Sequence, residues 1–274
     1  MPFNYRKHLK ELDEFAGRRV VEIYEKADRI MQDRMRNTLS SQLNKNLVNQ
    51  TITFNEKVIN AALAQTQKPI QDTVKQSYLL GVDNIQSAVK GAAVGITFEQ
   101  LSIAEKEQIQ ALMQEIYLQF GQTLTVVSRE SRNVLNAALR RQIREKVATG
   151  VLTGDSMEVI ARELRDQIFT PSGITAFTKK NGARMSLKEY TRMISRTMVM
   201  KSANEGSMTR MANLGLTVFQ ISTHGGACEI CVPHEGKIYD TTGKKYPKPQ
   251  ESDYPIFHPN CRHIIQARPE LQYL

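Results

Sequence analysis

Apolar residues recur at steps of three and four positions along most of this chain, with charged and polar residues between them. That spacing places them on one face of an α-helix. It predicts helices over residues 5–37, 39–65, 70–90 and 98–148. The first helix is expected to bury Val20, Ile23, Ala27, Ile30 and Met31. The fourth carries the longest stripe: Ile109, Leu112, Ile116, Phe120, Leu124 and Val127, continued by Val134, Leu135, Ala138, Leu139, Ile143 and Val147.

Three local signals are expected to divide this helical region. The β-branched run Thr51–Phe54 is predicted to interrupt the second helix, because such side chains fit a helix less well. Pro69 is predicted to stand in the first turn of the third helix, where its missing N–H costs nothing. Gly91 and Gly95 are expected to end that helix.

Further signals follow residue 148. A helix capped by Asp155 or Ser156 is predicted to reach Phe169. Pro171–Gly182 is predicted to be a loop, and the string TAFTKKNGAR (residues 175–184) a small hairpin with its turn at Lys180–Gly182. Ser186 and Glu189 have the spacing of a capping box, which opens a helix to about Leu214. Gly215 is suited to terminate that helix.

The apolar pattern changes after Gly215 from helical to alternating. Short strands are predicted at Leu216–Ser222, at Gly236–Asp240 and at Ile264–Ala267. The same stretch concentrates metal-binding chemistry, because residues 224–263 contain all three cysteines and four of the five histidines. Strands this short bury little apolar surface, so a structural metal ion would help to hold them together.

The spacing of these residues is typical of a tetrahedral Zn²⁺ site. Cys228 and Cys231 form a C-x-x-C pair, and His258 and Cys261 form an H-x-x-C pair, so each pair can reach one ion from a tight turn. The three cysteines are the expected ligands. The fourth position is open between His258, which completes the second pair symmetrically, and His263.

Together these signals predict a mainly α protein, with a long-helix body followed by a small C-terminal α+β module stapled by zinc. The predicted domains are a helical body (1–150), a helical connector (151–215) and a Cys/His metal-binding module (216–274).

The sequence offers two candidate catalytic residues. His224 or His234 could serve as a general base beside the metal, as in a metal-dependent nuclease, but a zinc ion with four protein ligands has no open position for water. The chain lacks a phosphate-binding glycine loop, a nucleophile elbow and an H-E-x-x-H motif. These observations favour a protein that is not an enzyme.

The net charge of the chain is +9, and residues 179–274 alone contribute +6. A basic surface favours an acidic partner, either nucleic acid or an acidic protein face, although solubility alone also explains such an excess. No apolar run is long enough for a membrane span, so no membrane partner is expected. An odd number of cysteines favours a reducing compartment.

The C-terminal third resembles a known family. Residues 170–267 include the strings HGGACEIC, GKIY and HPNCRH, and these resemble the phage minor capsid, or head morphogenesis, proteins, including minor capsid protein 2 and the Mu protein F-like group. The resemblance implies a virion component, made in the host cytoplasm, that lies inside the capsid near the portal and has no enzymatic activity there. Many relatives have cysteine where this chain has His263, which supports His263 as a ligand.

The expected function is therefore structural: head morphogenesis, with docking to portal and capsid proteins and nonspecific contact with packaged DNA. Oligomerisation on assembly is compatible with that role. Two alternatives are a metal-dependent nuclease using His224 or His234, and a nucleic-acid-binding regulator. The regulator would require a fixed sequence preference, and the helical body shows no recognisable helix-turn-helix.

Overall fold

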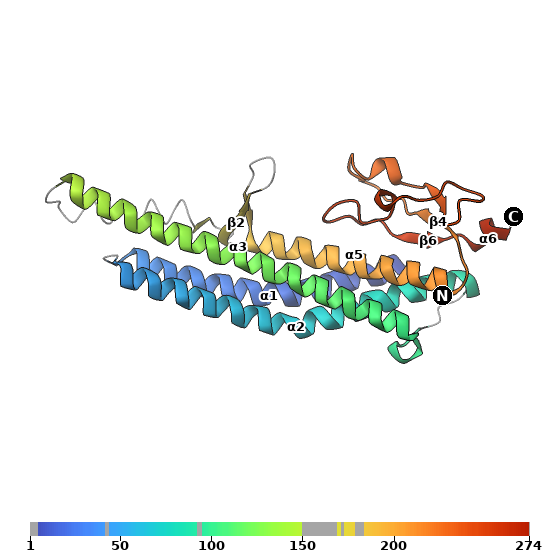
Figure 1. Ribbon diagram of the computed structural model, residues 1–274, viewed down its shortest axis with the longest axis horizontal. Helices are drawn as coiled ribbons and strands as arrows, with labels where there is room; N and C mark the ends of the chain where they lie inside the picture. The colour runs from blue at the N-terminus through green and yellow to red at the C-terminus, as the bar shows by residue number, and fades with distance from the viewer. Residues whose placement is uncertain are drawn as a thin grey trace. The chain divides into compact units, whose positions relative to one another are not determined.

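A computed structural model describes residues 5–41, 44–91, 95–149, 169–170, 173–178 and 184–273 of the chain. The protein is mainly helical with a small C-terminal sheet, as predicted (Figure 1). The long helices are α1 (Tyr5–Leu39), α2 (Lys45–Lys90), α3 (Ile103–Thr149) and α5 (Leu187–Asn213). None of the described helices has an apolar stretch that could cross a membrane.

The chain divides into two compact units. The first contains Met1–Arg18, Lys68–Tyr117 and Met193–Leu274, and the second contains Arg19–Gln67 and Leu118–Arg192. Helices α1, α2, α3 and α5 therefore contribute residues to both units. The predicted domain division after residues 150 and 215 stays a prediction.

Helix α2 corrects two sequence-based expectations, because it is continuous through both Thr51–Phe54 and Pro69. The Thr51 side chain is fully buried, and its hydroxyl lies 2.7 Å from the Thr38 hydroxyl of α1. This tertiary contact outweighs a weak local preference against helix. Pro69 lies inside the helix, and its carbonyl accepts a hydrogen bond of 2.7 Å from the Thr73 hydroxyl.

The first part of the α3 stripe, from Ile109 to Val127, is buried as predicted, with Ile109, Ile116 and Phe120 at most 1% exposed. Farther along, Val134 and Leu139 are half-buried, and the side chains of Ile143 and Val147 lie outside the described part of the chain. In the second unit, Phe120 stacks on Tyr24 of α1 at 5.9 Å between ring centroids. Tyr24, and not Ile30, belongs to the buried face of α1, because Ile30 is 39% exposed. The expectation that Ile30 would be buried was therefore wrong.

The second unit also contains a three-stranded antiparallel sheet, β1 (Phe169–Thr170), β2 (Gly173–Thr178) and β3 (Arg184–Ser186), in the order β1-β2-β3. The pairing of β2 with β3 confirms the predicted hairpin. Its turn, and residues 155–168 of the predicted helix, lie outside the described residues. Phe169, the predicted last residue of that helix, instead begins strand β1.

Both ends of helix α5 follow the predicted local chemistry. At the start, the Ser186 N–H donates to the Glu189 carboxylate at 2.9 Å, and the Glu189 N–H donates to the Ser186 hydroxyl at 3.2 Å. At the end, Gly215 has φ +67°, and the Leu216 N–H donates to the Met211 carbonyl at 2.9 Å. This reversal satisfies helix carbonyls and directs the chain into the C-terminal sheet.

In the first unit, α2 and α5 touch through their backbones. A Cβ atom at Gly81 would lie 1.9 Å from the Ala203 carbonyl oxygen, and one at Gly206 would lie 2.3 Å from the Tyr78 carbonyl oxygen. The Ser207 hydroxyl donates to the Gly81 carbonyl at 3.1 Å. Only glycine permits so close an approach.

The C-terminal sheet has the order β5-β4-β6, with β4 (Val218–Ile221) in the centre and β5 (Ile238–Asp240) and β6 (Ile265–Ala267) antiparallel to it. These strands confirm the predicted positions. The core between this sheet and the helices contains Phe219, Ile221 and Ile265 together with Met211 of α5 and Ile85 of α2. The side chain of Asn204 in α5 also makes a hydrogen bond on each side of Ile264. It donates to the His263 carbonyl and accepts from the Ile265 N–H.

Candidate metal centre

The candidate site is built from two tight turns. In the first, the Cys231 N–H donates to the Cys228 carbonyl at 2.9 Å. In the second, the Cys261 N–H donates to the His258 carbonyl at 3.1 Å, and Asn260 adopts φ +67°, a left-handed conformation that asparagine tolerates. Each turn thus presents its two donor side chains from a single reversal of the chain.

The sheet brings these turns together. The first follows β4 and the second precedes β6, and these strands are neighbours, with Ile221 opposite Ile265. Just beyond that pair, the Ser222 N–H donates to the Ile264 carbonyl and the Ser222 hydroxyl accepts from the Ile264 N–H, both at 3.0 Å. Strand pairing therefore places donors about thirty residues apart in sequence at one end of the sheet.

All five predicted donor residues meet there. The Nε2 atom of His258 lies 3.2 Å from the Cys228 sulfur and 3.0 Å from the Cys231 sulfur. The Cys231 and Cys261 sulfurs are 4.0 Å apart, and Nδ1 of His263 is 3.5 Å from the Cys261 sulfur. These contacts form two groups of side chains that could each hold a metal ion, and Cys231 belongs to both. One group adds Cys228 and His258, and the other adds Cys261 and His263.

These separations suit a tetrahedral ion. With Zn–S bonds of about 2.3 Å and Zn–N bonds of about 2.0 Å, two sulfur ligands stand about 3.8 Å apart, and a sulfur and a nitrogen about 3.5 Å apart. The observed distances of 4.0, 3.5, 3.2 and 3.0 Å lie close to these values. Thiolate and imidazole are also the donors that zinc prefers in closed sites.

The hydrogen bonds of both histidines leave the inward nitrogen available as a ligand. Nδ1 of His258 lies 2.6 Å from the Pro259 carbonyl, which can only accept, so Nδ1 carries the proton and Nε2 faces the sulfurs. Nε2 of His263 lies 3.0 Å from the Glu235 carboxylate, so Nδ1 faces Cys261. A carboxylate or carbonyl behind a ligating histidine is the usual arrangement in metal sites.

The electrostatics favour a cation between these groups. Burial lowers the pKa of His263, which favours its neutral, ligating form. The N–H group of Cys231 lowers the pKa of the Cys228 thiol. The main cause that raises the pKa of Cys231 is burial, which disfavours a charged thiolate. The neighbouring Cys261 raises it further, because two thiolates repel each other when no cation lies between them. A bound cation reverses that repulsion.

Glu235 is the site residue that sequence reasoning missed. Its carboxylate accepts from the His224 N–H at 2.8 Å as well as from His263, and these two donors lower its pKa. The His224 ring lies 4.3 Å from the His263 ring, so His224, Glu235 and His263 form a third cluster beside the cysteines. Nothing in the sequence indicates that Glu235 faces a histidine 28 positions away.

His234 is placed differently. Its ring stacks on Phe257 at 4.1 Å, and its Nδ1 lies 3.7 Å from an Asp253 oxygen. It belongs to none of the potential metal-binding groups of the described residues. Its position gives no support to the interpretation of His234 as a general base beside a metal.

The geometry defines a class: a mainly helical protein whose small C-terminal sheet gathers Cys/His groups that could bind a metal ion. The family of phage minor capsid protein 2 matches residues 10–267, nearly the whole chain, and the protein belongs to that family. It is thus a structural protein of a bacteriophage virion. No curated protein and no solved structure matched the chain.

Proposed function

We propose that this protein acts in phage head morphogenesis, where it docks to the portal or the inner face of the capsid and contacts packaged DNA without sequence preference. The family match over residues 10–267 is the observation that carries this proposal, because a minor capsid protein must contact other virion proteins. The net charge of +9 supports the contact with DNA.

Within that role, the C-terminal region is held by one structural Zn²⁺ ion. Cys228, Cys231, His258 and Cys261 are the proposed ligands, because they come in two matching pairs, each closed by the same backbone hydrogen bond between its first and last residues. His263 competes for the fourth position, since its Nδ1 also faces a sulfur. With four protein ligands the ion would hold the fold together and leave no position for catalytic water.

Metal analysis tests this assignment. We expect about one zinc ion per purified chain, and its loss in Cys261→Ser and His258→Ala. His8→Ala is the matched control, because His8 is the one histidine outside the Cys/His region, and it should keep the metal. Loss of zinc from His263→Ala together with full retention in His258→Ala would assign the fourth position to His263. A wild-type chain without metal would refute the zinc proposal.

The assembly role is tested in particles. We expect the protein in gradient-purified heads, and we expect it to co-purify with portal or capsid protein when these are co-expressed. Absence from the particles, or binding to neither partner, would contradict docking.

The nuclease alternative makes a separate prediction, plasmid cleavage with Mg²⁺ or Mn²⁺ that His224→Ala abolishes. DNA contact of the proposed kind would instead weaken steeply with salt and show no sequence preference.

A further inference from the structure

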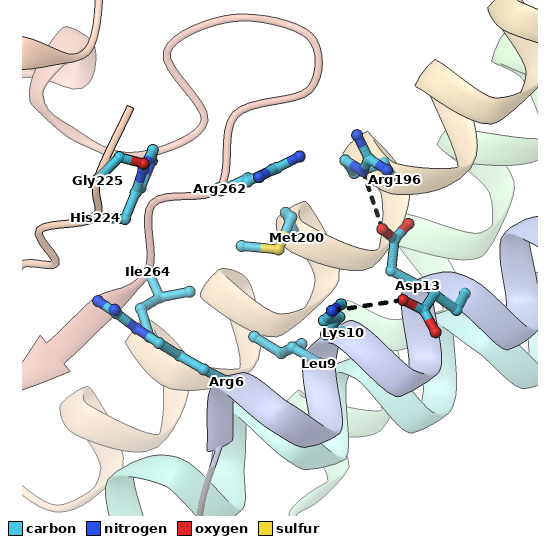
Figure 2. A pocket seen from close by; sticks show the side chains of 11 residues that line it. Arg6, Leu9, Lys10, Asp13, Arg196, Met200, His224, Gly225, Arg262 and Ile264 are labelled. Atoms are coloured by element: carbon cyan, nitrogen blue, oxygen red, sulfur yellow. Dashed lines mark hydrogen bonds and ion pairs between the residues drawn. The ribbon is translucent and has the colours of Figure 1, made fainter. Parts of the chain in front are cut away.

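A pocket of about 290 Å³ lies beside the metal-binding region, within the first unit. Helix α1, helix α5 and the two segments at His224–Gly225 and 262–264 surround it (Figure 2). Its apolar lining consists of Leu9, Met200 and Ile264, of which Leu9 and Ile264 are almost fully buried. The three side chains form a floor that could receive an apolar side chain.

The remaining lining carries an excess of positive charge. Four cations, Arg6, Lys10, Arg196 and Arg262, surround the floor, together with only two carboxylates. Both carboxylates are already engaged: Asp13 accepts from Nε of Arg196 at 2.9 Å, and Glu14 lies 3.9 Å from Nζ of Lys10. Arg6 donates to the Thr223 carbonyl at 2.7 Å. The pocket is therefore suited to an anionic group.

Arg262 is the cation best placed to receive that group. It makes no hydrogen bond or ion pair with any residue that the structure describes, and it is exposed. Its side chain extends over Met200 toward Arg196, as Figure 2 shows. Two guanidinium groups that converge in this way attract a carboxylate, which can bridge their parallel N–H donors.

The backbone holds Arg262 in place. Its chain neighbours Cys261 and His263 are both buried, and the His263 carbonyl accepts from the Asn204 amide of α5 at 3.1 Å. On the other side of the pocket, no atom beyond Gly225 and its two chain neighbours lies within 4 Å of the position that a Cβ of Gly225 would take. The backbone that carries Arg262 is thus anchored on one side of the pocket, and the Gly225 side is open.

We propose that this pocket binds an acidic peptide segment of another protein of the same virion. A carboxylate of the peptide lies between Arg262 and Arg196, and an apolar side chain next to it packs on Leu9, Met200 and Ile264. The identification of the partner as a virion protein rests on the proposed function. DNA fits less well, because an apolar floor adds nothing to binding of the phosphate backbone.

The test uses purified full-length protein and overlapping, fluorescently labelled 12-residue peptides that cover the portal protein and the other structural proteins of the same phage. We expect saturable binding of peptides that pair Asp or Glu with a neighbouring apolar residue. Arg262→Ala should weaken that binding at least about tenfold, the loss expected for a charged, bidentate hydrogen bond. Lys68→Ala removes one exposed charge of the same unit outside the pocket and should change binding less than about twofold.

A second variant separates charge from shape. Gly225→Phe keeps all four cations and places a ring at the mouth of the pocket, so it should also abolish peptide binding. Metal content and circular dichroism of both pocket variants should match the wild type. The proposal is overturned if no peptide binds below about 1 mM, or if both variants bind as well as the wild type. It is equally overturned if Arg262→Ala weakens binding only to a DNA duplex.

The two proposals can fail separately. Peptide binding by a chain that is absent from the particles would contradict the assembly role and leave the pocket standing. Incorporation into particles without peptide binding would contradict the pocket alone.

Discussion

The α2–α5 contact and the Cys/His region belong to the same unit, but their segments meet in different ways. Helices α2 and α5 approach until the backbone of one touches the other at Gly81 and Gly206, so the contact depends on missing side chains. In the Cys/His region, two turns meet through the side chains of three cysteines and two histidines. An added side chain at Gly81 or Gly206 should therefore disrupt the α2–α5 contact. Loss of a cysteine or histidine donor, or of the metal, should disrupt the Cys/His region.

The largest expected effect is that of metal removal. Chelation of the purified protein should accelerate amide hydrogen exchange in β4 and β6 at least about a hundredfold, because these short strands bury too little apolar surface to hold without the ion. Helix α3 should keep its protection, since its stripe is buried independently of the site. Equal protection of the sheet with and without chelator would show that the two turns are held by packing alone.

The helix contact is tested with a single methyl group. Gly81→Ala should destabilise the protein by about 2 kcal/mol in urea unfolding, because the new Cβ would overlap the Ala203 carbonyl and force the helices apart. Gly121→Ala is the matched control: it also lies inside a long helix, but its Cβ would find only the Leu63 side chain, at 3.8 Å. That substitution should stabilise by up to about 1 kcal/mol through helix propensity. Equal effects of the two would refute the close backbone contact.

The smallest effect concerns Asp240, which orders the loop after β5. Its buried carboxylate accepts from the Thr242, Lys244 and Lys245 N–H groups at 2.9 to 3.0 Å. Burial by itself would raise the pKa of Asp240, but these hydrogen bonds outweigh it and hold the pKa well below its ordinary value. Asp240→Asn should therefore cost about 1.5 kcal/mol at pH 7.

The pH dependence of that cost has a definite sign. Because the pKa of Asp240 is lowered on folding, the stabilisation is fully present above the unfolded pKa of about 3.9 and is lost as the pH falls toward the folded pKa. The difference in unfolding free energy between wild type and Asp240→Asn should thus narrow below about pH 4. Asp33→Asn, at an exposed carboxylate on α1, should change stability by less than about 0.5 kcal/mol throughout.

Much of this protein could be predicted from sequence because the signals are local. The apolar stripe of α3, the capping box at Ser186 and the glycine stop at Gly215 each depend on residues within a few positions of one another. The two donor pairs depend on two-residue spacers that any tight turn can use. For such features, chain connectivity already places the interacting groups near one another.

Other features were decided by tertiary structure. Thr51 stays helical because its hydroxyl forms a hydrogen bond with the Thr38 hydroxyl of another helix. Position 81 requires glycine because the backbone of α5 lies against it. Glu235 meets His263 only after β4 and β6 pair, and Arg262 faces Arg196 only after the sheet packs on α5. Hydrophobic periodicity predicts which face of a helix is buried but not which residues pack against it. These long-range contacts therefore could not be predicted from sequence alone.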